Sequence, residues 1–178
     1  MNQQINNLLF KKIIILFWTA WWLMALWTDV AGALVHINII TASWAQDLNY
    51  PMLVQSLSLY HVPSWLPPCL FIGILLWSLI NAGLFVWASL GLNQSPEIWL
   101  RRAQYAFIIS LTFWFAFFIA DQVVMDFNLE QNHMVQGGFQ LLTYLTLFML
   151  PDPHYYPEPS KRASVGDIPD RKGEEKAD

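Results

Sequence analysis

Four long apolar stretches constrain the fold of this 178-residue chain more than any other feature of its sequence. They cover residues 13–35, 65–90, 103–124 and 129–150. A helix of about 20 mainly apolar residues crosses a hydrocarbon core of about 30 Å. Backbone groups in lipid must hydrogen-bond within their own segment, and no stretch alternates polar and apolar residues as a barrel strand does. The sequence therefore predicts an all-α fold, an integral membrane bundle of four transmembrane helices.

The composition agrees with a chain surrounded by lipid. Apolar residues make up 56% of the sequence and charged residues only 12%, whereas soluble domains carry about 25% charged residues. The net charge is −4, and the sequence has no basic stripe that would bind the phosphates of a nucleic acid. We therefore expect the lipid bilayer as the main partner and no binding of nucleic acid.

The positive charges predict the orientation of the bundle. They lie in the N-terminus, in the loop between the second and third stretches, and in the C-terminal tail: Lys11, Lys12, Arg101, Arg102, Lys161, Arg162, Arg171, Lys172 and Lys176. The loops 36–64 and 125–128 contain no lysine or arginine. Because loops rich in these residues stay in the cytoplasm, we expect both termini to be cytoplasmic. The predicted location is the inner (plasma) membrane of a bacterial-type cell.

The chain divides into a transmembrane domain, residues 1–150, and a tail, residues 151–178. The tail is rich in proline and charge, which predicts a flexible cytoplasmic segment. The outer loop 36–64 carries several aromatic rings and is expected to form one or two short amphipathic helices in the headgroup region. At the helix ends, Gly91 is expected as a left-handed terminator, and Asn128 with Gln131 as a capping box.

Two carboxylates are predicted at similar depth within the membrane. Asp29 lies about 24 Å along its helix from Ile13, and Asp121 lies about 27 Å along its helix from Ala103. These two helices run in the same direction, so both side chains are expected in the outer part of the bilayer. Ionisable groups at that depth are costly, and each is a candidate for function.

Other polar residues are predicted to gather around this level. The expected cluster within the membrane consists of Asp29, Asp121, Gln122, Asp126, Gln136 and Gln140. Imidazole and carboxylate ligands suit zinc, copper or iron, and the candidate metal ligands are His36, Glu130 and His133. Glu130 and His133 have the spacing used in di-iron bundles, although the motif occurs only once. Three interpretations stay open: hydrogen bonds that fix helix register, a metal or haem site, and a path for protons or a solute.

No motif in the chain identifies an activity. The single cysteine, Cys69, excludes an internal disulfide and a paired-cysteine redox site. The sequence favours an accessory or scaffolding subunit of a larger membrane complex, with other membrane subunits or copies of itself as partners. The alternatives are a metal- or haem-binding redox protein, a small proton-coupled transporter, and an enzyme that acts on lipid. Whether the protein is an enzyme is left open.

Overall fold

The computed structural model describes residues 2–41, 44 and 48–151, and within them the fold is entirely helical. Four long helices are α1 (Asn2–His36), α3 (Leu66–Leu90), α4 (Pro96–Val124) and α5 (Phe127–Met149). Between α1 and α3 lie the short helix α2 (Asn49–Ser56) and one 3₁₀ turn, η1 (Leu57–Leu59). The all-α prediction is confirmed. The predicted flexible tail falls outside the described residues, apart from Pro151.

Three helical segments in the described part of the chain are long and apolar enough to cross a membrane: Ile5–His36, Leu66–Leu90 and Pro96–Val124. They support a multi-pass membrane protein. The helix α5 has 23 residues, which is also a spanning length. Its first half is more polar, and it is not among these three.

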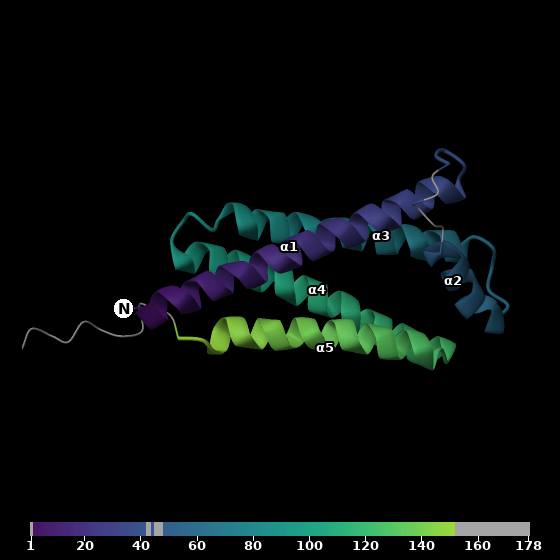
Figure 1. Cartoon of the computed structure of the whole chain (residues 1–178). Helices are drawn as coiled ribbons and strands as arrows, with labels where there is room; N and C mark the ends of the chain where they lie inside the picture. The colour runs from purple at the N-terminus through teal and green to yellow at the C-terminus, as the bar shows by residue number, and fades with distance from the viewer. Residues whose placement is uncertain (1, 42–43, 45–47, 152–178) are drawn as a thin grey trace, which may run out of the picture.

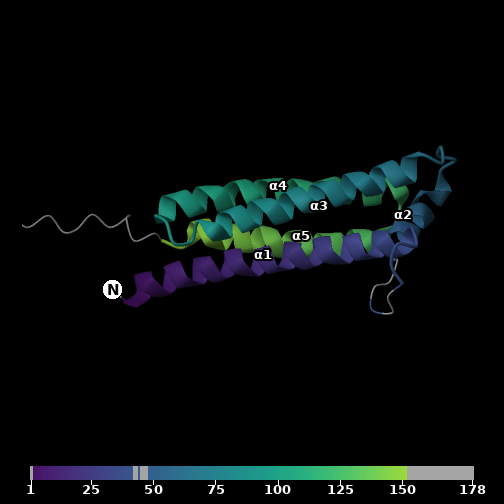
Figure 2. The same ribbon diagram turned by 90° about the horizontal axis from the view of Figure 1, so that it is seen from above.

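The four long helices form two pairs that separate toward one end. In Figure 1, α1 crosses α3 and ends at the upper right, whereas α4 and α5 run together toward the lower right. The short helix α2 lies at this end, which we call the α2 end. The N-terminus, the α3–α4 turn and the last residues of α5 all lie at the opposite end (Figures 1 and 2).

Large aromatic side chains hold the two pairs together away from the α2 end. Trp18, Phe85, Trp99 and Phe107 are completely or almost completely buried, and the rings of Phe85 and Phe107 meet edge to face at 5.2 Å. Such ring pairs add about 0.5–1.5 kcal/mol beyond the apolar area that they bury. The indole of Trp18 also donates a hydrogen bond to Thr143 Oγ1 at 2.8 Å, which connects α1 with α5.

The two predicted helix-end signals are both wrong. Gly91 has a right-handed φ of −82°, whereas the left-handed residues other than glycine in the described part of the chain are Asn38 and Met125, with φ values of 59° and 56°. The cap of α5 is Asp126, whose Oδ1 accepts a hydrogen bond from the Leu129 amide at 3.2 Å. The left-handed turn at Met125 ends α4 immediately before Asp126, so that Asn128 already lies inside the first turn of α5.

Candidate functional site

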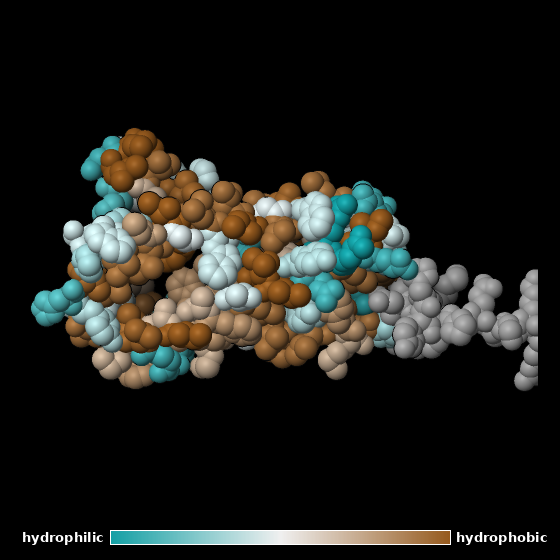
Figure 3. Space-filling model, turned by 180° about the vertical axis from the view of Figure 1, so that it is seen from behind, coloured by the Kyte–Doolittle hydropathy of each residue, from teal (hydrophilic) through white to brown (hydrophobic). Residues whose placement is uncertain are grey.

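A cavity of about 480 Å³ lies between the separating helix pairs near the α2 end. Residues from all four long helices, from α2 and from η1 line it. In the space-filling view of Figure 3, the surface is hollowed toward this end, on the face opposite to that seen in Figure 1. The segment α2–η1 is tied to the end of α4, because Tyr60 Oη donates a hydrogen bond to the Val123 carbonyl. The fold therefore encloses this space at the α2 end.

Six aromatic rings contribute to the cavity wall. They come from α1, α3 and α4, and they are Trp21, Trp22, Phe71, Phe113, Trp114 and Phe117. The rings of Trp22 and Phe113 stand edge to face at 5.5 Å, and those of Phe113 and Phe117 at 4.7 Å. The first contact joins α1 to α4 and the second lies within α4, so these rings form a mainly apolar wall.

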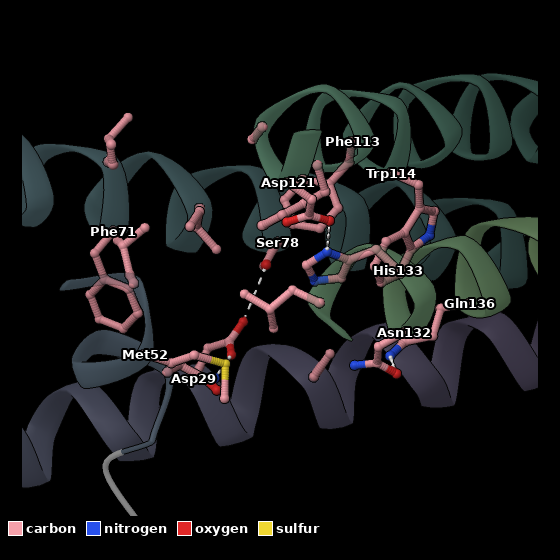
Figure 4. Close-up of a pocket in the computed structure, with 18 of the residues that line it drawn as sticks. Asp29, Met52, Phe71, Ser78, Phe113, Trp114, Asp121, Asn132, His133 and Gln136 are labelled. Carbon is pink, nitrogen blue, oxygen red and sulfur yellow. Dashed lines mark hydrogen bonds and ion pairs between the residues drawn. The ribbon is translucent and has the colours of Figure 1, made fainter. Parts of the chain in front are cut away.

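The buried carboxylate Asp121 on α4 is paired with His133 on α5. Asp121 is 3% exposed, and its Oδ2 lies 2.6 Å from His133 Nδ1 (Figure 4). The ring of Phe117 packs against the imidazole in a tilted arrangement, with 4.5 Å between the ring centroids. The second ring nitrogen of His133 faces the cavity in Figure 4. An imidazole held in this way presents Nε2 as a hydrogen-bonding group to any molecule in the cavity.

The second carboxylate, Asp29 on α1, faces the same cavity from the other helix pair (Figure 4). Its Oδ1 accepts a hydrogen bond from Asn49 Nδ2 at 2.7 Å, and its Oδ2 accepts one from Ser78 Oγ at 3.3 Å. Both donors are neutral. No lysine or arginine is among the described residues that line the cavity.

A tryptophan in the wall carries an unused hydrogen-bond donor. Trp22 is 1% exposed, and its indole Nε1 has no hydrogen-bond partner among the described residues. Buried indole N–H groups usually find a partner. The indole N–H of Trp22 is therefore a buried donor without a partner in the described part of the chain.

The structure places four of the predicted polar residues at the cavity and the others elsewhere. Asp29, Asp121, His133 and Gln136 line it. Gln122 donates to Glu130 at 2.6 Å on the exposed side of the α4–α5 hairpin, outside the cavity lining. Asp126 serves as the cap of α5.

The two remaining predicted residues also lie outside the cavity lining. Gln140 is buried beside Trp114 and accepts its indole hydrogen bond at 2.7 Å. His36, at the end of α1, packs its ring against Tyr50 at 4.4 Å.

The predicted metal site does not assemble. His36, Glu130 and His133 have three different sets of neighbours. No group of three or more histidine, cysteine, aspartate or glutamate side chains in the described part of the chain is arranged to hold a metal ion. His36, Glu130 and His133 therefore do not form a shared metal site in the described structure.

Sequence reasoning missed the contributions of α2 and α3 to the site. Asn49 and Ser78 hold the Asp29 carboxylate, yet each is an ordinary polar residue without a motif around it. Asn132 is likewise part of no motif. It lines the cavity and accepts a hydrogen bond from Gln136 at 3.1 Å.

Comparisons of the chain with protein-family models, with curated proteins and with solved structures found no match.

Proposed function

We propose that this protein is a four-span membrane protein that binds a small amphiphilic molecule in the cavity between its helix pairs. The observation that carries the proposal is the cavity itself: about 480 Å³, with aromatic walls and a few polar groups that converge from separate helices. Small-molecule sites have this size and this combination of apolar walls and sparse polar anchors. Asp29 and the Asp121–His133 pair are the anchors for the polar end of the ligand.

The arrangement of charges and helices supports four spans with both termini in the cytoplasm of a cell with an inner (plasma) membrane. Lys11 and Lys12 on α1 and Arg101 and Arg102 on α4 lie toward the end of the bundle opposite α2. The helix α5 runs antiparallel to α4 over a spanning length, and part of its polar first half faces the cavity rather than lipid. This placement accounts for its lower apolarity without removing it from the membrane.

Labelling of single cysteines tests the four-span arrangement. In a Cys69→Ser background, we expect a membrane-impermeant maleimide added to intact cells to label Ser64→Cys and Gln131→Cys. Asn93→Cys, in the α3–α4 turn, and Pro151→Cys, after α5, are expected to react only after the membrane is opened. All four positions are on or near exposed ends of helices. Labelling of Pro151→Cys in intact cells would show that α5 does not cross.

A cavity-filling substitution tests the binding proposal. Ala120 lines the cavity, whereas Ala116, one turn earlier on α4, is exposed and outside it. We expect Ala120→Phe to weaken binding of phenylpropanol, a neutral aromatic amphiphile, by about tenfold, because the new ring takes up part of the space. Binding is measured by tryptophan fluorescence in lipid nanodiscs, where partition into the bilayer is common to both variants.

Ala116→Phe is the matched control and is expected to bind phenylpropanol as the unchanged protein does. Equal binding by both variants, or no binding by the unchanged protein, would contradict a ligand site in this cavity.

An accessory role in a larger membrane complex is a second proposal, and a flat aromatic surface supports it. The rings of Trp27 and Trp44 stack in parallel at 5.9 Å, and both are more than half exposed. Large aromatic residues are enriched where protein partners meet. Native mass spectrometry of the protein extracted with its own lipids tests this role. An accessory subunit is expected in a complex whose mass exceeds the 20.6 kDa of the chain because other polypeptides are bound to it.

A further inference from the structure

We propose that the ligand of the cavity is an organic cation, such as a quaternary ammonium or an alkylated amine with an apolar body. This inference rests on the proposed binding function and names the chemical class of the ligand. Three features of the cavity support it: its carboxylates, the absence of lysine and arginine from its described lining, and the aromatic rings of its wall.

The carboxylates give the cavity a negative character. Among the described residues, Asp29 accepts hydrogen bonds from the neutral donors Asn49 and Ser78 alone, and Asp121 has the imidazole of His133 as its partner. Two carboxylates thus share the space with at most one positive charge. A carboxylate away from bulk water is costly unless a positive charge compensates it. A bound cation beside Asp29 supplies that compensation.

The lysines and arginines of the described chain lie outside the cavity lining. Arg102 stacks over the ring of Trp87 at 4.8 Å and donates to the Trp87 carbonyl at 3.2 Å, at the end opposite α2. Lys11, Lys12 and Arg101 are also outside the cavity lining. Because no described lysine or arginine lines the cavity, a positive charge beside Asp29 would come from a ligand.

The aromatic walls suit the same class of ligand. Trp21 and Trp22 come from the helix that carries Asp29, and Phe113, Trp114 and Phe117 face them from α4. The electron-rich face of a tryptophan or phenylalanine ring attracts a cation, and cages of such rings are the usual sites for quaternary ammonium groups. A cage of rings with a carboxylate beside it binds an organic cation more tightly than a neutral molecule of the same shape.

A pair of probes with the same shape and different charge tests the inference. Benzyltrimethylammonium is the cation, and neopentylbenzene, in which carbon replaces the nitrogen, is its neutral counterpart. We expect the unchanged protein in nanodiscs of phosphatidylcholine to respond to the cation at a concentration in the membrane at least about tenfold lower than for the neutral probe. Intrinsic tryptophan fluorescence reports binding, since three tryptophans line the cavity.

The variant Asp29→Asn removes the charge and keeps the size of the side chain. We expect it to weaken binding of the cation by about tenfold and to leave binding of neopentylbenzene within about twofold. Glu97→Gln is the control, because Glu97 lies in the first turn of α4 at the opposite end of the bundle. It removes one negative charge from the chain without touching the cavity, and it is expected to change neither affinity.

Each outcome separates the inference from the proposed function. Equal affinity of the unchanged protein for both probes, together with binding of phenylpropanol, overturns the cation inference and retains the cavity as a binding site. No response to any of the three probes overturns both. If Asp29→Asn does not fold, the preference of the unchanged protein for the cation over neopentylbenzene decides the matter by itself.

Discussion

His133→Ala is expected to lower the stability of the helical bundle by about 2–3 kcal/mol, because it leaves the buried carboxylate of Asp121 without its partner. The substitution also removes the ring that packs on Phe117. The measurement is the midpoint of thermal unfolding in detergent micelles, followed by tryptophan fluorescence. A clear decrease in this midpoint is the expected result.

Two further variants show whether the lost partner is the cause. Asn132→Ala, at the neighbouring position, removes an exposed hydrogen bond to Gln136 and is expected to change stability by less than about 0.5 kcal/mol. In the double variant Asp121→Asn/His133→Ala no charge is left buried, so it is expected to be more stable than His133→Ala alone. If the double variant is instead no more stable than His133→Ala alone, the unpaired charge of Asp121 is not the cause of the lost stability.

The sequence predicted the long helices well because length and apolarity alone limit what can cross a bilayer. The helix α3 begins at Leu66 and ends at Leu90, within one residue of the predicted range 65–90. The helices α1 and α4 begin much earlier than predicted, at Asn2 and Pro96. Apolarity marks only the part of a helix that lies in lipid, whereas backbone hydrogen bonds continue the helix beyond it.

The sequence does not predict which side chains face the cavity. The rise of a helix predicts Asp29 and Asp121 at similar depth, and both of them line the same cavity. Gln122, next to Asp121, points away from it toward Glu130. One residue turns a side chain by about 100° around the helix, so an error of one position changes its neighbours completely. Facing depends on how the helices pack, which the polar spacing of one helix does not determine.

The contributions of α2 and α3 to the site required the three-dimensional structure. Asn49 reaches Asp29 from 20 residues away, and Ser78 reaches it from 49 residues away. Neither separation follows from the repeat of a single helix, because the three residues lie on three different helices. The helix α2 packs against both α1 and α3. Residues of α2 and η1 line the cavity together with the four long helices, and no local pattern in the sequence encodes this arrangement.

Gly137→Ala is expected to destabilise the α4–α5 pair by about 1–3 kcal/mol, because a methyl group at this position has no room. A Cβ added at Gly137 would lie 2.9 Å from the Cβ of Trp114 and 2.8 Å from Cζ of Phe118. The Trp114 atom is bonded directly to the backbone of α4, so the two helices must move apart. Trp114 also lines the cavity and donates to Gln140, and a shift of α5 therefore disturbs the site as well.

The adjacent glycine provides a control within the same turn of α5. A Cβ added at Gly138 has no atom within 4 Å outside its own neighbours. Alanine also favours a helix over glycine by about 1 kcal/mol, so Gly138→Ala is expected to leave the thermal midpoint unchanged or to raise it. The opposite signs expected for two neighbouring glycines distinguish close packing of α4 against α5 from a general effect of glycine on the helix. Equal midpoints for the two variants would contradict the close approach of α5 to Trp114.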